Sequence, residues 1–375
     1  MALSAGVFNH EHPFTIGVEE EYMLCNPESG NLINRADEIM ERLPESLKDR
    51  FSYELILSEI EINTSVNTTV DGAINEIASL RQFTQELGNK LGFQIGISGT
   101  HPTAICKEQS FVRNESYNWV ADQLNFYARR NVTFALHIHI AVPNKDAAIH
   151  ISNALRRWIA PLLALSTNSP YFEGEFTGIR SSRTFQFGIF PRTNIPVMFD
   201  NFEKYQQIVE NYLNTKTIEK PRQIWWKLRP HFDYGTIEFR ISDVQRSLKK
   251  VEMFVALAQA LVYQANEEYE KGTLSESFNL EYLNDALWKA ARFPFDKQLI
   301  DPLTIEISTM TDQIKKMAAY SEKALLHFNT AHVLDEVDMI LRNGTEGDDQ
   351  KRIHDKYGMK DLKLFLMKNV DYTLN

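Results

Sequence analysis

The sequence predicts an α+β fold in which helices pack on one face of a largely antiparallel sheet. Strand-like runs that alternate polar and apolar residues are concentrated between residues 14 and 246, whereas from Leu248 onward the chain is nearly all helix-like. No clean linker separates these two parts. We therefore expect a single catalytic domain over residues 1–375, with a sheet-bearing core (14–246) and a mainly helical part (247–375).

The predicted elements follow one another in mixed order. Strands are expected at 14–24, 51–57, 59–64, 93–98, 132–142, 225–229 and 236–241. Helices are expected at 35–42, from 71 past 87, at 117–129, 145–165 and 199–213, and through most of the chain after 248. Pro161 is expected to kink the helix at 145–165. Residues 168–196 form a loop-rich region, and connections of that length are usually functional.

The composition excludes several classes of protein. Of the 375 residues, 43% are hydrophobic and 24% are charged, which is typical of a globular protein. A formal net charge of −10 argues against nucleic acid as a partner, because nucleic-acid binding needs a basic surface. Two cysteines make no disulfide framework, which fits a reducing cytoplasm. No signal peptide and no run of ~20 apolar residues is visible, so we expect no membrane contact and a cytoplasmic location.

The first predicted strand, Phe14 to Leu24, carries three adjacent carboxylates. Successive side chains of a strand point to opposite faces, so Glu19 and Glu21 should share one face and Glu20 should point away. Two like charges on one face repel each other, and a divalent cation would relieve that repulsion. An acidic edge strand in solvent is the alternative interpretation.

Three further strands repeat this spacing of two residues. The pairs are Glu59 with Glu61, His137 with His139, and Glu238 with Arg240. Taken singly, each pair is ordinary for an exposed face or a cross-strand ion pair. Together they predict one polar sheet face that forms a site, while the intervening apolar residues form the core. Carboxylates with one or two imidazoles suit Mg²⁺ or Mn²⁺ better than zinc, and a nearby arginine suggests phosphoryl transfer.

The loop-rich region adds Arg180, Arg183 and Arg192, which could bind carboxylate or phosphate or could simply be solvated. In Trp225-Trp226 one indole could stack on a base or could fill core, and we assign the nucleotide contact to Trp226. Other enzyme signatures are missing from the sequence: there is no GxxxxGK[ST], GxGxxG after a strand, GxSxG or HExxH.

The ordered motifs of this chain resemble glutamate–cysteine ligase type 2, and more closely the bacterial carboxylate–amine ligase branch of that family. The motifs that carry the resemblance are Gly17-Val18-Glu19-Glu20-Glu21, Glu61-Ile62-Asn63-Thr64, Gly99-Thr100-His101-Pro102, His137-Ile138-His139, Asn168-Ser169-Pro170, Glu173-Gly174, Ser181-Ser182-Arg183, Pro191-Arg192-Thr193, and Trp225-Trp226 through Thr236-Ile237-Glu238-Phe239-Arg240. The resemblance implies a glutamine synthetase-like fold, with a curved sheet whose concave face holds metals and ATP. It also implies ATP-dependent amide formation through an acyl phosphate, with γ-glutamylcysteine as one product to test.

The resemblance also implies roles for individual residues. Glu19 and Glu21 would bind different metal ions, Glu61 would join one of them, and His137 and Glu238 would join the other. His139 would lie nearer the nucleotide phosphates. To the nucleotide we also assign Arg180 and Trp226, which the resemblance does not place. Arg240, Arg183 and Arg192 would act on the phosphoryl group or the substrate carboxylate.

Two other functions stay open at this stage. One is a guanidino kinase-type phosphotransferase on the same fold, and the other is a non-catalytic nucleotide-binding relative. We expect small carboxylate and amine substrates, and the sequence leaves the oligomeric state open, with a homodimer as one option.

Overall fold

The computed structural model describes residues 5–8, 11–113 and 115–374. The strands are β1 (Ile16–Cys25), β2 (Phe51–Ser52), β3 (Glu59–Asn63), β4 (Gln94–Gly96), β5 (Ala135–Ala141), β6 (Tyr171–Phe172), β7 (Glu175–Phe176), β8 (Leu228–His231), β9 (Thr236–Asp243), β10 (Gln298–Ile300) and β11 (Ile307–Thr309). The α-helices are α1 (Ala36–Arg42), α2 (Val70–Leu91), α3 (Glu115–Leu124), α4 (Lys145–Leu155), α5 (Ile159–Ser166), α6 (Ser182–Gly188), α7 (Phe202–Asn214), α8 (Leu248–Glu270), α9 (Leu280–Arg292), α10 (Met310–His327), α11 (Leu334–Asn343), α12 (Glu346–Tyr357) and α13 (Met359–Lys368).

One antiparallel sheet organises the molecule, which confirms the predicted fold class. Within the described residues it has seven strands in the order β2-β3-β1-β5-β9-β8, and β4 also pairs with β1. β1, at its centre, is the strand predicted at 14–24. Its alternating residues place Val18, Glu20 and Tyr22 on one face and Glu19 and Glu21 on the other.

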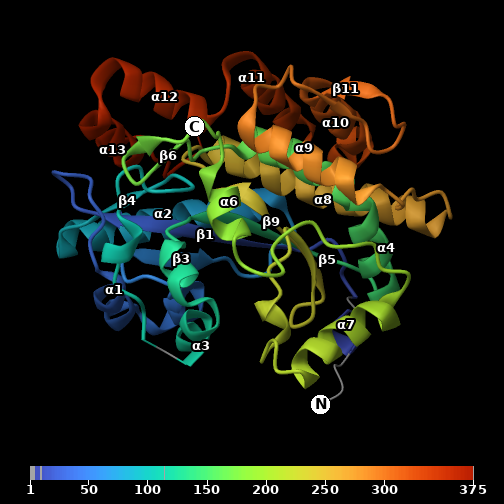
Figure 1. Ribbon diagram of the computed structural model, residues 1–375, viewed down its shortest axis with the longest axis horizontal. Coiled ribbons are helices and arrows are strands. Elements are labelled where there is room, and N and C mark those ends of the chain that lie inside the picture. The colour runs from blue at the N-terminus through green and yellow to red at the C-terminus, as the bar shows by residue number, and fades with distance from the viewer. Residues whose placement is uncertain (1–4, 9–10, 114, 375) are drawn as a thin grey trace.

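Helices cover the first of these faces (Figure 1), which we call the helical face. α2 and α8 pack on β1, and α4 and α5 pack nearer β8 and β9. The apolar partners of the polar pairs, including Ile60, Ile138 and Ile237, are buried there. α10 and α11 form an outer layer on α8, so the sheet has a thick helical cover on one side and the cavity described below on the other.

Glu20 confirms the predicted register of β1. Its carboxylate is fully buried on the helical face and pairs with the guanidinium of Arg81 on α2 at 2.7 Å. Arg81 also donates to the backbone carbonyls of Gln245, Arg246 and Asp371. Glu20 therefore holds structure together and takes no part in the polar face.

Several predicted elements differ from the structure. The run 51–57 is a strand only at Phe51–Ser52, because residues 55–57 bond instead to the segment 110–112. The strand predicted at 225–229 is β8, displaced to Leu228–His231; Pro230 is tolerated inside it because β8 is a sheet edge. The helix predicted at 145–165 is interrupted by a 3₁₀ turn at Arg156–Trp158, which separates α4 from α5. Pro161 lies in the first turn of α5 and cannot donate a helical hydrogen bond, so the interruption predicted at this proline is present. The C-terminal part also contains the hairpin β10–β11, which the helical pattern did not predict.

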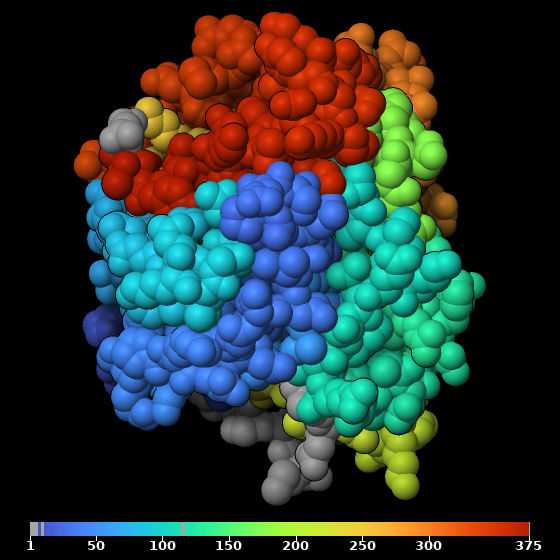
Figure 2. Space-filling view, turned by 90° about the vertical axis from the view of Figure 1, so that its left-hand side faces the viewer, coloured from blue at the N-terminus to red at the C-terminus, as the bar shows by residue number. Residues whose placement is uncertain are grey.

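The C-terminal helices pack against the N-terminal third of the chain. In Figure 2 the red C-terminal segment lies directly beside the blue and cyan residues. α13 contacts β4, and the amide of Ile97 donates to the carbonyl of Leu366. Across the described residues, no helix is both long enough and apolar enough to cross a membrane.

Candidate active site

The polar pairs predicted from the sequence come together in one ladder across the face opposite the helices. The strand register places Glu21 opposite Glu61, Glu19 opposite His137, and His139 opposite Glu238. Residues directly opposite each other in antiparallel strands have neighbouring side chains. The spacing of two residues therefore builds a continuous polar surface from β3 through β1 and β5 to β9.

Two overlapping groups on this surface have ligand atoms close enough to share a metal ion. Glu19, His137 and Glu238 form one group, and Glu21, Glu61 and His137 form the other. Within each group the ligand atoms lie within 4.8 Å of one another. His137 belongs to both, with Nδ1 at 3.1 Å from Glu19 and Nε2 at 4.0 Å from Glu21. Two neighbouring ions could thus be held by groups that meet at one imidazole.

Four carboxylates crowd together at the β3 end of the ladder. Burial raises the pKa of Glu21 to about 7, although Arg183 and Arg240 oppose the shift. Burial and the charge of Glu21 raise the pKa of Glu54 to about 8. Burial and neighbouring carboxylates also raise the pKa values of Glu59 and Glu61. One oxygen of Glu59 is buried without a hydrogen-bond partner among the described residues. A divalent cation would relieve this mutual repulsion, so the donor set fits Mg²⁺ or Mn²⁺.

The middle of the ladder is electrostatically different. Burial alone would raise the pKa of Glu19, but His139 and His137 hold it below the usual range. His139 Nε2 lies 3.2 Å from Glu19, and its Nδ1 lies 2.9 Å from the hydroxyl of Thr236. Burial and the charge of Arg240 lower the pKa of His137 to about 4, so its imidazole is neutral at pH 7 and available as a ligand.

Glu238 is held between two arginines. Arg229 Nη2 and Arg240 Nη1 each lie 2.5 Å from its carboxylate. Burial would raise the pKa of Glu238, but Arg229 and Arg240 keep it well below the usual value. Glu238 is therefore ionised, and the arginines fix its orientation toward Glu19 and His137.

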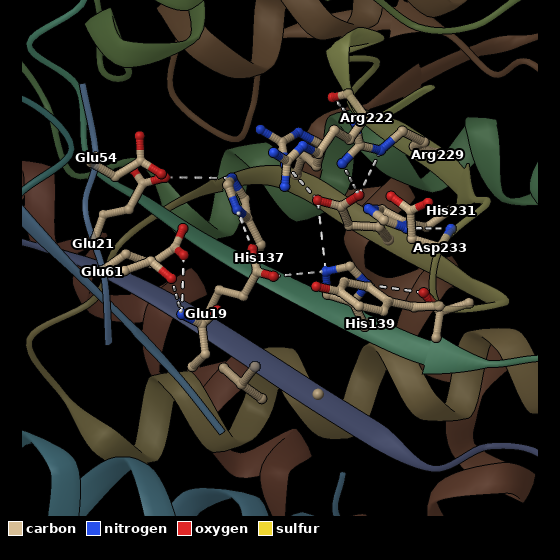
Figure 3. A pocket seen from close by; sticks show the side chains of 18 of the residues that line it. Glu19, Glu21, Glu54, Glu61, His137, His139, Arg222, Arg229, His231 and Asp233 are labelled. Carbon is tan, nitrogen blue, oxygen red and sulfur yellow. Dashed lines mark hydrogen bonds and ion pairs between the residues drawn. The ribbon is translucent and has the colours of Figure 1, made fainter. Parts of the chain in front are cut away.

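The ladder forms the floor of a cavity of about 860 Å³. Figure 3 shows Glu21, Glu54 and Glu61 at one end, Arg229, His231 and Asp233 at the other, and Glu19 and His137 between them. The cavity lining also includes Arg183, Arg222, Arg240, Tyr117, Trp225 and Tyr234. This volume lies at the upper end of small-molecule sites, and the two ends differ in charge.

Two motifs of the loop-rich region place Arg183 at the cavity by converging on Asp243. The hydroxyls of Ser169 and Ser181 donate to Asp243 at 2.7 and 2.9 Å. Arg183 then donates to the carbonyls of Ile241 and Arg240 on β9. Gly99 belongs to the same arrangement, because a Cβ there would lie 2.6 Å from the carboxyl carbon of Asp243. These motifs therefore set the position of one arginine.

Three residues predicted for the site do not line the cavity. Arg180 pairs with Asp348 on α12 and donates to the carbonyl of Phe293. Trp226 is buried against Phe199 and Tyr205, so it fills core. The displaced start of β8 puts the other indole, Trp225, on the cavity.

Arg192 lies behind Trp225, with its guanidinium near the faces of Trp225 and Tyr212. We therefore leave Arg180, Arg192 and Trp226 out of the site proposed below.

Among the cavity residues that sequence reasoning did not assign, Glu54 and Arg229 matter most for the charge of the site. Glu54 lies in the irregular segment after β2, where side chains do not alternate between two faces, so the sequence does not show which way it points. A carboxylate between Tyr53 and Leu55 was the one indication of a functional role. Arg229 was not assigned to the site, because the strand predicted at 225–229 is displaced and its register with Glu238 could not be anticipated.

Known proteins resemble this chain over most of its length. Residues 15–361 match the family model described as glutamate–cysteine ligase family 2. A relative from Herpetosiphon aurantiacus is 31% identical over 350 residues, which cover 93% of this chain and 91% of the relative. Relatives from Chloroflexus aurantiacus and Gloeobacter violaceus are each 32% identical to this chain. Both matches include 91% of this chain, and they include 87% and 92% of the respective relatives. All three carry the name "Putative glutamate--cysteine ligase 2".

Solved structures share the fold at low sequence identity. A glutamate–cysteine ligase from Francisella tularensis in complex with AMP has a TM-score of 0.74 at 12% identity, covering 97% of this chain and 89% of that one. A bifunctional glutathione synthetase from Pasteurella multocida has a TM-score of 0.71 at 13% identity. The match covers 97% of this chain but spans about half, 52%, of that two-activity protein. The ligase PafA, in complex with the ubiquitin-like protein Pup, has a TM-score of 0.56 at 12% identity.

Proposed function

Because the chain belongs to glutamate–cysteine ligase family 2 and is an enzyme of the ligase class, we propose that it joins a carboxylate to an amine at the expense of ATP. In this reaction the carboxylate attacks the terminal phosphoryl group of ATP, and an acyl phosphate forms as ADP leaves. The amine then attacks the acyl carbon and loses a proton, and inorganic phosphate leaves. The observation that supports this proposal most is the ladder that gathers Glu19, Glu21, Glu61, His137 and Glu238 beside two arginines.

We assign the metal sites to the two overlapping groups of the ladder. Glu19, His137 and Glu238 would hold one ion, and Glu21 and Glu61 the other. The resemblance implied separate ions for Glu19 and Glu21, and the grouping of ligand atoms supports placing Glu61 with Glu21. We add Glu54 to the second group, because it lines the same cavity and its carboxylate interacts with that of Glu61. When bound, Mg²⁺ or Mn²⁺ would neutralise charge on the phosphates of ATP.

The arginines of the chain supply fixed positive charge at the reacting centre. Arg240 and Arg183 both line the cavity and both act on the charge of Glu21. Their guanidinium groups are pinned by Glu238 and by β9 carbonyls, so they need little reorganisation to stabilise a developing negative charge. His139, held by Thr236 and Glu19, would lie on the nucleotide side.

For the substrates, we propose glutamate and cysteine as the first pair to test, with γ-glutamylcysteine as product. Support comes from the names of the relatives and from the cavity, whose volume of about 860 Å³ is large enough for a nucleotide together with a small acid. A cytoplasmic location fits the two cysteines, Cys25 and Cys106, which are buried and unbridged.

The test is the release of ADP and phosphate by purified protein with Mg²⁺ and ATP, measured with and without a panel of amino acids and amines. We expect release to require both a carboxylate and an amine, and mass spectrometry should detect the matching amide. Glu19→Gln serves as the inactive control, because it removes a charged metal ligand from the ladder while the glutamine side chain keeps the size and shape of glutamate.

Two results would contradict the proposal. Equal phosphate release without any carboxylate or amine would exclude ligation. ADP release with a phosphorylated small molecule and no free phosphate would favour the phosphotransferase alternative.

A further inference from the structure

A buried lysine, Lys227, lies beside the arginines of the cavity and has no part in the function proposed above. It directly precedes β8, and its carbonyl accepts a 2.9 Å hydrogen bond from the amide of Arg240 on β9. Since β8 pairs Arg229 with Glu238, Lys227 lies opposite Arg240 on the edge of the sheet. The residue is only 4% exposed.

Lys227 has no carboxylate partner of its own among the described residues, whereas Arg240 pairs with Glu238 and Arg183 lies 3.9 Å from Asp243. Like charges directly opposite each other in a sheet are destabilising, and Arg183 adds a third cation nearby. Asp243 is the neighbouring carboxylate, but it already accepts hydrogen bonds from Ser169, Ser181 and the amide of Asn168. Within the part of the chain that the structure describes, the ammonium of Lys227 has neither a side-chain hydrogen bond nor an ion pair. Burial is the main cause that lowers the pKa of Lys227 to about 7; the charges of Arg183 and Arg240 lower it further, and Asp243 opposes the shift.

We propose that Lys227 is a positioning residue for an anion: with Arg183 and Arg240 it makes a cationic subsite for a phosphoryl or carboxylate group. Arg183 and Arg240 line the cavity and Lys227 does not, so Lys227 acts through them. It adds positive charge behind the two guanidinium groups and strengthens their attraction for a bound anion. Buried cations that lack a counter-charge are costly, and an anion in the cavity would offset that cost. The identity of the anion rests on the proposed function, whereas the existence of the subsite does not.

The test compares wild type with Lys227→Met, which removes the charge, and Lys227→Arg, which keeps it. Lys204→Met, on the exposed face of α7, is the matched control. Calorimetric titrations use inorganic phosphate, Mg²⁺-ATP, Mg²⁺-ADP and glutamate, each added alone, and melting temperatures are recorded without ligand.

We expect Lys227→Met to weaken phosphate binding roughly tenfold or more, because interactions with charged partners are worth about that factor. Lys227→Arg should restore most of the affinity, and Lys204→Met should not change it. Without ligand, Lys227→Met should melt no lower than wild type, since it removes an uncompensated charge. A residue with only a structural role would show the reverse, a lower melting temperature with unchanged affinity.

The four ligands distinguish the source of the anion. Weaker ATP binding with unchanged ADP binding assigns the subsite to the transferred phosphoryl group, and weaker glutamate binding assigns it to the substrate carboxylate. If all affinities stay within about twofold of wild type, or if wild type binds none of the four, the inference is overturned. Phosphate binding that depends on Lys227 in a protein without ligase activity would overturn the proposed function alone.

Discussion

At the scale of single residues, the cavity combines carboxylates that resist ionisation with carboxylates that are held ionised. The pKa values of Glu21 and Glu54 are raised to about 7 and about 8. In contrast, His139 keeps the pKa of Glu19 below the usual range, and two arginines do the same for the pKa of Glu238. A cation that binds at the β3 end must therefore displace protons, while at the Glu19 end the negative charge is already present.

Removing either central carboxylate of the ladder should abolish turnover. Glu19→Gln or Glu21→Gln each removes a charged donor from one metal group, and we expect a loss of roughly 10³-fold or more in ADP release. The melting temperature of Glu21→Gln should not fall, because the substitution removes repulsion. Glu45→Gln, an exposed carboxylate, is the control. Full activity in either ladder variant would show that the metal groups are wrongly assigned.

The raised pKa of Glu54 predicts how stability and metal binding depend on pH. Its pKa in the folded protein, about 8, lies above the ordinary value of 4.5, so the folded state binds the proton more tightly than the unfolded state. Its contribution to stability is therefore greatest below about pH 4.5 and falls as the pH rises toward 8.

The difference in melting temperature between wild type and Glu54→Gln should accordingly shift against wild type from pH 5 to pH 8 without metal. Because a cation binds the ionised carboxylates, added Mn²⁺ should raise the melting temperature of wild type more at pH 8 than at pH 6. A metal effect that is independent of pH would exclude proton displacement at Glu54.

At the scale of elements, β1 uses its two faces for different purposes. Its cavity face supplies Glu19 and Glu21, and its helical face supplies Glu20, whose ion pair with Arg81 ties β1 to α2. The adjacent carboxylates thus have separate roles, one in structure and two in the site.

Glu20→Gln should damage stability much more than catalysis. It leaves the guanidinium of Arg81 buried without its counter-charge, which costs about 3–5 kcal/mol. Urea denaturation should show this loss, while the folded fraction should retain turnover within a few-fold of wild type. The double variant Glu20→Gln/Arg81→Met should be less destabilised than the sum of its single variants, since it removes both charges. Turnover lost as completely as in Glu19→Gln, in folded protein, would contradict the purely structural role assigned to Glu20.

At the scale of the whole molecule, α12 in the C-terminal part is hydrogen-bonded to the segments that follow β4, α5 and β9. Glu346, at the start of α12, accepts hydrogen bonds from the amides of Arg246 and Ser247 and from the side chain of Asn168. Gln350 on the same helix donates to Asn168 and to the hydroxyl of Ser98. These contacts support the proposal that residues 1–375 form a single domain.

We therefore predict one cooperative unfolding transition, with coincident curves from tryptophan fluorescence and circular dichroism. Glu346→Gln should lower the stability by about 2 kcal/mol, because it weakens hydrogen bonds to a charged acceptor. Asp335→Asn, exposed on α11, is the control. A fragment ending at residue 246 should not fold, and a folded fragment would show instead that the C-terminal part is a separate unit.

The sequence by itself determined what depends on local periodicity. The alternation of strand side chains is a property of each strand alone, so the shared faces of Glu19 with Glu21 and of His137 with His139 were predictable, as was the opposite face of Glu20. The fold class followed from the same patterns. The interruption at Pro161 was also predictable, because proline has no amide hydrogen to donate. Helix ends were less predictable, because tertiary packing overrides local propensity there.

Only the tertiary structure decided which of these residues meet. The register between strands far apart in the sequence brings His137 to Glu19 and Arg229 to Glu238, and the alternation within one strand carries no information about it. Glu54 reaches the cavity from an irregular segment, and Arg180 and Trp226 turn away because Asp348 and an aromatic cluster bind them. Such placements depend on long-range contacts, whose geometry is set only when the whole sheet and its helical cover have assembled.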